Sequence, residues 1–186
     1  MALRKASAYS KKHMVAYTRK SKIKQRSYIK AVPPQKIVKF NLGNVSGYTH
    51  GKFNYIVRML ASEEIMIRDN ALEAARQYIN KKLELAYPGQ YYFKVTPVPH
   101  HVLRENKMIT GAGADRMQTG MQLSFGKPMG RGAIVHKNRE IFLVAVESEK
   151  QFPVARQAMQ EVKAKLPCRT HFVFEKVQPK LAPKTA

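Results

Sequence analysis

The spacing of apolar residues predicts two successive strand–helix–strand units. In the first unit, residues 64–68 and 91–95 have the apolar, β-branched and aromatic composition of strands, and Pro88-Gly89 ends the helix between them. That helix is expected to begin at an N-cap at Asp69 or Asn70 and to run to about Leu85. Its buried face is predicted to comprise Leu72, Ala75, Ile79 and Leu83, which recur at helical spacing.

The second unit repeats this order. Residues 141–146 and 171–177 are predicted strands, and a helix from about Lys150 to Lys165 lies between them, with Ser148 as its candidate cap. Two such units, each with one helix, predict an α+β fold: an α/β sandwich with helices on one face of a mainly antiparallel sheet. The apolar stripe of the second helix is predicted to comprise Ala155, Ala158, Met159, Val162 and Leu166.

The rest of the pattern divides the chain into a basic arm, one domain and a tail. Residues 1–35 show neither sustained helical nor alternating periodicity, so they are interpreted as an extended N-terminal arm. A single domain is expected over residues 36–177, beginning with a strand at 37–42, while residues 44–61 are ambiguous. Residues 178–186 are interpreted as a flexible C-terminal tail.

The segment between the two units is rich in glycine and lacks periodicity. Residues 100–104 are compatible with a short strand, which leads into a loop at about 105–118. Loops of this length are uncommon in compact domains and are usually functional or disordered, and glycine lets backbone N–H groups approach a phosphate closely. Residues 125–132 form a second glycine-rich cluster. The cations in these two segments are Lys107, Arg116, Lys127 and Arg131.

Charge points to a polyanionic partner. The 186 residues include 34 Lys+Arg and 12 Asp+Glu, a net charge of +22, and no acidic residue precedes Glu63. Such a charge repels itself unless a polyanion is nearby, and nucleic acid releases counterions when it binds. A solvated basic face would not explain the acid-free start, and the arm lacks the apolar stripe of a membrane-bound helix. The arm cations are Arg4, Lys5, Lys11, Lys12, Arg19, Lys20, Lys22, Lys24, Arg26 and Lys30.

Three tyrosines, Tyr9, Tyr17 and Tyr28, lie among these cations. Their rings could stack on unpaired bases while Lys and Arg contact phosphates, as in many proteins that bind single-stranded RNA. They could equally anchor the arm to the domain. The sequence leaves both interpretations open for each ring.

No complete catalytic, cofactor or membrane motif is present. No apolar run approaches the roughly 18–20 residues of a membrane span, and we expect no secretory signal. Residues 111–115 lack the third glycine of a dinucleotide fingerprint, and no Gly-Lys-Ser/Thr follows them. Cys168 alone cannot form an internal disulfide or a multi-thiolate metal site. We therefore expect no cofactor, no metal, no membrane and no small-molecule substrate.

Histidines supply the strongest argument for an enzyme. His100 and His101 are adjacent, so on a strand they point to opposite faces and cannot share a metal from that element. We expect one of them to pack and the other to contact phosphate. His136 and Asp115 could join one of them in space, so an RNA-modifying enzyme is a second hypothesis, and a DNA-coating protein, based on charge alone, is a third.

Three short motifs carry a family resemblance. Asn-Lys-Met at 106–108, Ala-Gly-Ala-Asp-Arg-Met-Gln-Thr-Gly-Met at 112–121 and Phe-Gly-Lys-Pro at 125–128 resemble the signature of the universal large-subunit ribosomal protein family called L-sixteen. The chain is most similar to its archaeal and eukaryotic branch, L-ten-e, and residues 71–76 and 99–104 also fit. The cysteines and the long C-terminal segment of eukaryotic members are missing here, which favours the archaeal branch.

The resemblance implies a non-enzymatic protein of cytoplasmic ribosomes, located in the large subunit near the peptidyl transferase centre, with large-subunit rRNA, the tRNA acceptor end and neighbouring ribosomal proteins as partners. The arm would insert among rRNA helices, and Lys127 and Arg131 would also contact rRNA. The loop would extend toward tRNA. Carried onto this sequence, the tRNA-facing residues are Arg104, Lys107, Gly111, Gly113 and Arg116.

Overall fold

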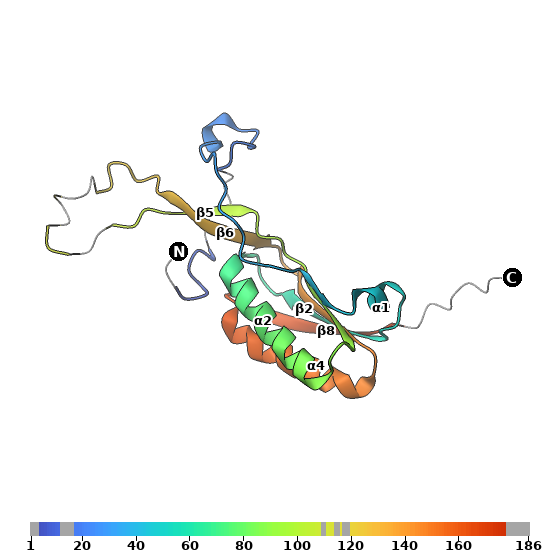
Figure 1. Cartoon of the computed structure of the whole chain (residues 1–186). Coiled ribbons are helices and arrows are strands. Elements are labelled where there is room, and N and C mark those ends of the chain that lie inside the picture. The colour runs from blue at the N-terminus through green and yellow to red at the C-terminus, as the bar shows by residue number, and fades with distance from the viewer. Residues whose placement is uncertain (1–3, 12–16, 109–110, 114–115, 117–119, 178–186) are drawn as a thin grey trace.

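A computed structural model of the chain shows two antiparallel sheets, with a layer of helices against the larger one (Figure 1). It describes residues 4–11, 17–108, 111–113, 116 and 120–177. Within these ranges, no helix combines the length and the apolar character that crossing a membrane requires.

The larger sheet has five strands in the order β1-β4-β7-β2-β8, and each neighbouring pair is antiparallel. The central β7 is buried along nearly its whole length because both of its faces are covered, which explains its uninterrupted apolar sequence. The strands predicted at 91–95, 141–146 and 171–177 are confirmed to within one residue. The five strands are β1 (Asn41–Gly43), β4 (Tyr91–Val95), β7 (Glu140–Val146), β2 (Tyr55–Ala61) and β8 (Thr170–Lys176).

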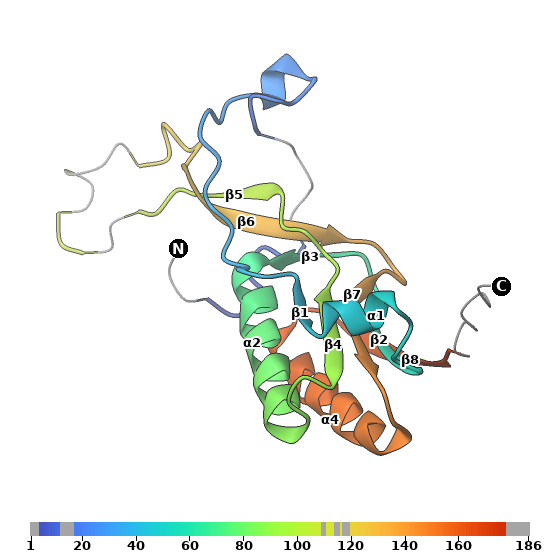
Figure 2. The ribbon, with the colours of Figure 1, turned by 45° about the vertical axis from the view of Figure 1, so that its right-hand side comes forward.

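Helices α2 (Asp69–Ala86) and α4 (Phe152–Val162) lie side by side on one face of this sheet (Figure 2). The opposite face is covered in part by the short helix α1 (Val45–Thr49), where Tyr48 stacks on Tyr92 with ring centroids 4.1 Å apart. The predicted α+β fold is therefore confirmed. All members of both predicted apolar stripes are buried: Leu72, Ala75, Ile79, Leu83, Ala155, Ala158, Met159, Val162 and Leu166.

Local boundaries follow hydrogen bonds that the pattern of apolar residues does not reveal. Ser148 forms a capping box with Gln151 in the 3₁₀ turn η2 (Glu149–Gln151) that precedes α4, so the predicted cap is confirmed. For α2, however, the N-cap is Arg68, one residue earlier than predicted. The carboxylate of Asp69 instead accepts hydrogen bonds from the backbone N–H groups of Lys36 and Asn70, at 3.2 and 2.9 Å.

The smaller sheet contains β3 (Ile65–Arg68), β6 (Lys127–Val135) and β5 (His101–Glu105) in the order β3-β6-β5. The first strand–helix–strand unit therefore divides between the sheets, because β3 pairs with β6 rather than with a strand of the larger sheet. The cluster at 125–132 supplies a strand that its glycine content did not predict. Space is tight at Gly132, where an added Cβ would lie 3.0 Å from the side chain of Met66, so a larger residue would have to displace that side chain.

Candidate nucleic-acid interface

The start of the arm is attached to the smaller sheet through its backbone. The guanidinium of Arg68, on β3, donates hydrogen bonds to the carbonyl oxygens of Arg4 and Lys5, at 2.9 and 2.7 Å. The carbonyl of Ser10 accepts from the N–H of Met66 at 3.2 Å, and Ser10 is buried. Since these contacts use the arm's carbonyl groups, the cationic side chains of Lys5 and Lys11 remain exposed.

Arg104 connects the arm to the β5–β6 hairpin. Its guanidinium carbon lies 4.1 Å from the ring centroid of Tyr17, in the arm, and 4.1 Å from that of Phe125, just before β6. It also donates hydrogen bonds to the carbonyl of Phe125 and, at 3.1 Å, to the hydroxyl of Tyr17. We call these three residues the Arg104 clamp. The charge of Arg104 is thus engaged within the protein at the base of the loop.

Other aromatic and basic residues strengthen this attachment. Tyr28 packs edge-on against Phe125, with centroids 5.2 Å apart, while its side chain stays more than half exposed. Arg131, on β6, donates a hydrogen bond to the carbonyl of Pro33 at the end of the arm. The structure therefore gives Tyr17 and Tyr28 the anchoring role that the sequence left open, although the exposed face of Tyr28 can still stack on a base.

Between these anchors, the arm forms a closed loop that presents cations. The N–H of Arg19 donates to the carbonyl of Ile29, the N–H of Ile29 donates to the carbonyl of Tyr17, and the Ile29 side chain is buried. The cationic residues around this loop all lie at the surface, and Lys24 and Arg26 share the 3₁₀ turn η1 (Lys24–Arg26). Lys12 lies outside the described residues. The exposed arm cations are Arg4, Lys5, Lys11, Arg19, Lys20, Lys22, Lys24, Arg26 and Lys30.

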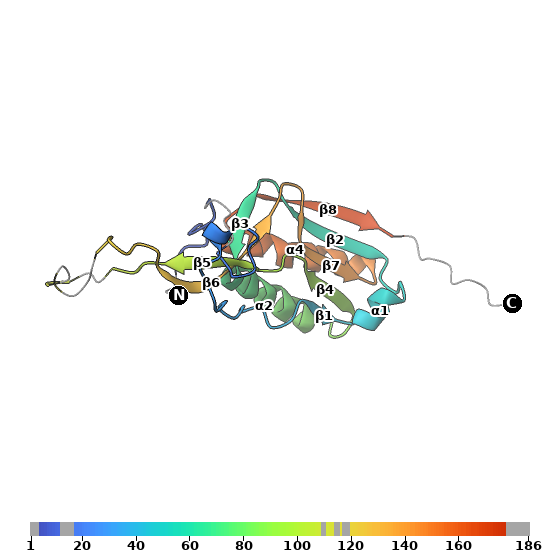
Figure 3. The ribbon, with the colours of Figure 1, turned by 90° about the horizontal axis from the view of Figure 1, so that it is seen from above.

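The described residues next to β5 and β6, 106–108 and 120–126, lead away from the body beyond the end of the smaller sheet (Figure 3). Lys107, Gly111, Gly113 and Arg116 are exposed, and the N–H of Arg116 donates to the carbonyl of Gly113 at 3.1 Å. Gly113 has a φ of +81°, a left-handed backbone conformation that favours glycine. Of the residues assigned to tRNA from the sequence, these four lie beyond the sheet, whereas Arg104 lies at its edge.

Arg4 and Lys127 lie on either side of Glu105, near the start of this segment. The side chain of Arg4 forms an ion pair with Glu105, the last residue of β5. Lys127, the first residue of β6, is exposed and lies opposite Glu105 in the strand register. The base of the hairpin therefore brings together a cation from the arm, a carboxylate from β5 and a cation from β6.

The histidines fall in different environments. His101 is buried beside the ring of Tyr17, and His100 is exposed, with its Nδ1 3.0 Å from the carbonyl of Val98. His136 follows β6 and lies 2.9 Å from the carboxylate of Glu64, where both side chains are more than half exposed. Asp115 lies outside the described residues. Among those described, no three His, Cys, Asp or Glu residues gather as metal ligands.

Shifted pKa values concentrate in the helical layer. Hydrogen bonds from Arg76 to the Glu73 carboxylate hold the pKa of Glu73 below its ordinary value, despite partial burial. Burial raises the pKa of the Cys168 thiol to about 11. Burial, with a hydrogen bond to Glu84, also raises the pKa of Tyr91. Because these groups belong to the packing of α2 and its neighbours, their shifts reflect structure rather than an active site.

Phe125 is the residue of this interface that sequence reasoning missed as an anchor. The sequence places it in a glycine-rich cluster and in the Phe-Gly-Lys-Pro motif at 125–128, but neither predicts a contact with the arm. Tyr17, which packs with Phe125 around Arg104, precedes Arg104 by 87 residues, so the spacing of residues along the chain does not predict this contact. The only signal was an aromatic residue at the start of a segment that also carries Lys127 and Arg131.

Comparison with known proteins agrees with the motifs in this hairpin. Residues 12–173 match the family model described as ribosomal protein L16p/L10e. The large ribosomal subunit protein uL16 of Staphylothermus marinus is 43% identical over 184 residues, which cover 98% of this chain and 99% of that protein. The protein of the same name from Sulfolobus acidocaldarius is 42% identical over 174 residues, covering 91% and 92%.

A third relative extends the comparison to another archaeon. The uL16 protein of Methanococcus maripaludis strain C7 is 41% identical over 180 residues, which cover 96% of this chain and 97% of that protein. The resemblance predicted from residues 106–128, including its archaeal character, is confirmed. Since the match to the family model extends from the arm to β8, and these relatives align over nearly their whole length, this chain belongs to the ribosomal protein L16p/L10e family.

Proposed function

We propose that this chain is a structural constituent of the large ribosomal subunit, which binds large-subunit rRNA and helps to position tRNA near the peptidyl transferase centre during translation. The observation that carries the proposal is the family match over residues 12–173, together with relatives named as large-subunit proteins. The proposal places the chain in cytoplasmic ribosomes, with neighbouring ribosomal proteins as further partners.

We propose that the arm is the segment that binds rRNA. The carbonyl groups of Arg4, Lys5 and Ser10 bond to the smaller sheet, while the cations of the arm's closed loop are exposed, which suits a segment that lies between a folded protein and phosphate groups. Lys127 adds an exposed cation at the base of the hairpin. Arg131 supports this surface by holding the end of the arm. We keep the division into an arm at 1–35, a domain at 36–177 and a tail at 178–186 as part of the proposal.

The segment between β5 and β6 is the proposed tRNA contact. Its described ends, at 106–108 and 120–126, lead away from the body, and Lys107 and Arg116 are exposed (Figure 3). Glycines at 111 and 113 have open space where a Cβ would be, so a nucleic-acid backbone can approach closely. Arg104 contributes by fixing the base of this segment through the Arg104 clamp.

Sedimentation tests the proposal. Tagged protein expressed in an archaeal host should co-sediment with large subunits at moderate salt and leave them after ribonuclease treatment. A variant with Arg19, Lys20, Lys22 and Lys24 changed to Gln should dissociate at lower salt. The matched control changes four exposed cations of the domain, Lys81, Lys137, Arg139 and Lys150, to Gln. Wild-type protein found only at the top of the gradient would refute the ribosomal role.

A second measurement addresses the loop. A photo-crosslinking amino acid at position 107 or 116 should attach to the acceptor end of tRNA in translating ribosomes, whereas the same amino acid at position 137 should not. Attachment of positions 107 and 116 to rRNA alone, in ribosomes that carry tRNA, would refute the tRNA contact and leave the rRNA role standing.

A further inference from the structure

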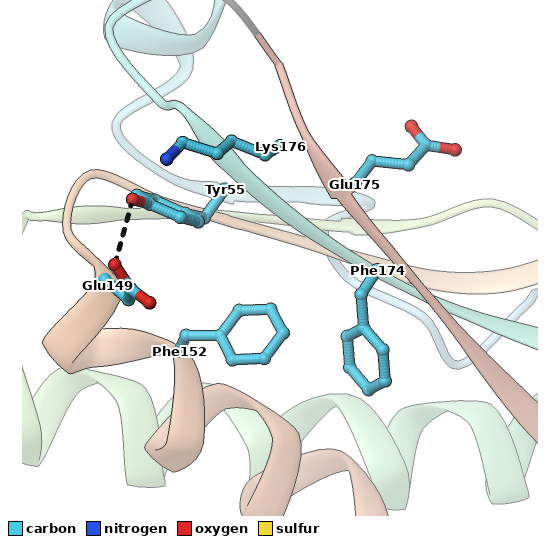
Figure 4. Close-up of a pocket in the computed structure, with 6 residues that line it drawn as sticks. All are labelled: Tyr55, Glu149, Phe152, Phe174, Glu175 and Lys176. Carbon is cyan, nitrogen blue, oxygen red and sulfur yellow. Dashed lines mark hydrogen bonds between the residues drawn. The ribbon is translucent and has the colours of Figure 1, made fainter.

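A groove between α4 and the edge strand β8 has no role in the function proposed above. Among the described strands, β8 pairs only with β2, so its other edge is open. Alternation along β8 turns Phe172, Phe174 and Lys176 toward α4. The groove contains a cavity of about 240 Å³ (Figure 4). The cavity is lined by Tyr55, Glu149, Phe152, Phe174, Glu175 and Lys176.

Aromatic rings form the walls of this cavity. Phe152 and Phe174 lie with their centroids 5.0 Å apart, and Tyr55 meets Phe152 edge-on at 6.5 Å. Phe174 is 42% exposed, although it stands on a strand whose neighbour β2 is mostly buried. Figure 4 shows the rings of Phe152 and Phe174 facing the same open space. An exposed ring beside a cavity is a surface on which a flat apolar group can stack.

The rings of Phe172, Phe174 and Tyr55 along the groove each have a cation above them. The guanidinium of Arg156 lies 5.4 Å from the Phe174 centroid, and the ammonium groups of Lys163 and Lys176 lie 4.6 and 5.5 Å from those of Phe172 and Tyr55. Arg156 and Lys176 are exposed. Rings that can stack on bases, next to cations that can meet phosphates, are the combination found where proteins hold single-stranded nucleic acid.

The acidic residues here do not cancel this charge. The Glu175 carboxylate turns away from the cavity and pairs with Arg58 at 3.0 Å (Figure 4). Glu149 stays at the cavity, where its carboxylate accepts a hydrogen bond from the Tyr55 hydroxyl at 3.4 Å. A single carboxylate beside stacking rings can accept a hydrogen bond from an exocyclic amino group, as carboxylates do when they contact cytosine. Lys176 lines the cavity and Arg156 lies over its Phe174 ring, so two cations stand beside Glu149, and the groove favours an anion over a basic peptide.

We propose that this groove binds one unstacked nucleotide of RNA, with its base stacked on the exposed ring of Phe174 beside the cavity, its phosphates against Arg156 and Lys176, and an amino group of the base on Glu149. This rests on the proposed rRNA-binding function and adds a second contact surface, on the helical layer rather than at the arm. A peptide strand added to the open edge of β8 is the competing occupant.

The free full-length protein tests base stacking in the groove without the ribosome. We would titrate it with adenosine 5′-monophosphate and follow the ring signals of its labelled phenylalanines and tyrosines by NMR. Ribose 5-phosphate, which carries the phosphate but no base, is the matched ligand control. The expected result is saturable upfield shifts of the Phe152, Phe174 and Tyr55 ring signals with the nucleotide only. Equal shifts with both ligands, or none with either, would overturn the proposal.

Variants separate the groove from the rest of the surface. Changing both Arg156 and Lys176 to Gln should weaken the nucleotide affinity about tenfold, as should Phe174→Leu. Two control changes should leave it unaltered: Arg139→Gln, an exposed cation at the other end of the sheet, and Leu85→Ala, an exposed apolar residue at the end of α2. If either control matched the groove variants, binding would be non-specific and the proposal wrong.

Crosslinking in large subunits identifies the occupant. Ultraviolet irradiation of purified subunits should leave a nucleotide on the peptide that contains Phe174, and this adduct should be absent with Phe174→Leu. A crosslink from Lys176 to another ribosomal protein, with no nucleotide adduct, would show that a peptide occupies the groove. Subunits that contain the protein but lack the adduct would overturn this inference and leave the proposed function intact, whereas absence of the protein from subunits would refute the proposed function.

Discussion

The Arg104 clamp gives a quantitative prediction, because one side chain joins the arm to the hairpin. In Arg104→Ala, two cation–π contacts and two hydrogen bonds are lost. Each cation–π contact at a half-exposed site contributes about 0.5–1 kcal/mol, and each hydrogen bond about 0.5–1.5 kcal/mol. Allowing for non-additivity, we expect the arm to be held less tightly by about 2 kcal/mol, which is a factor of about 30 in its opening equilibrium.

Hydrogen exchange in the free protein measures this factor directly. The amides of Arg19 and Ile29, which bond within the closed loop of the arm, should exchange about 30 times faster in Arg104→Ala, if exchange occurs through opening of the arm. Amides of the central strand β7 should be unaffected because they open only with the whole domain. In Arg104→Lys these two amides should exchange at a rate between those of the wild type and Arg104→Ala, because an ammonium group cannot lie flat against two rings.

Two results would refute the reasoning. If the Arg19 and Ile29 amides exchanged at the wild-type rate in Arg104→Ala, the clamp would contribute nothing to holding the arm. If Lys137→Ala, which removes an exposed cation elsewhere on the domain, accelerated them equally, the effect would come from overall charge rather than from the clamp.

Three further predictions concern the domain. Because the pKa of Glu73 is lowered by Arg76, this pair stabilises the fold above the ordinary carboxylate pKa of 4.5 and loses its effect as pH falls through the lowered value. Urea titrations should therefore show a smaller acid-induced loss of stability in Glu73→Gln, with a cost of about 1 kcal/mol at pH 7. Cys168, whose pKa is about 11, should react slowly with iodoacetamide at pH 8 and faster as pH approaches 11. Gly132→Val should cost about 1–3 kcal/mol in thermal unfolding, because its Cβ would press on Met66.

The elements that the sequence predicted well are those whose burial follows a regular period. The stripe containing Leu72 and Ile79 extends over several turns, so the position of α2 follows from it almost completely. The strand β6 carries no such signal, since Gly130 and Gly132 interrupt its pattern and its partner β5 lies beyond a loop without periodicity. Assignment of strands to one sheet or two depends on pairings between distant segments, which periodicity does not contain.

The candidate site shows the same division. The cations along the described part of the arm are exposed, as its charge composition led us to expect, because Ile29 is the only buried residue of the segment 17–30 that carries Lys22 and Arg26. Charge composition did not predict that Arg104 and Arg131 turn inward to hold the arm. Their hydrogen-bond acceptors are the Tyr17 hydroxyl and backbone carbonyls, which come from distant parts of the chain. The Lys and Arg residues counted in a sequence therefore include some that are available to bind a partner and others that make contacts within the protein.

Because Arg104 makes contacts within the protein, it links the proposed rRNA contact of the arm to the proposed tRNA contact of the β5–β6 segment. Tyr17 belongs to the arm, Phe125 and Arg104 belong to the hairpin, and the guanidinium between the rings makes the position of one depend on the other. An rRNA that fixes the exposed cations of the arm would also restrict the base of the segment that bears Lys107 and Arg116, because the clamp transmits the constraint. Conversely, freeing the arm by Arg104→Ala should loosen the projecting segment even though no residue within it has changed. Binding to rRNA and placement of tRNA would then be coupled through a contact that is part of neither interface.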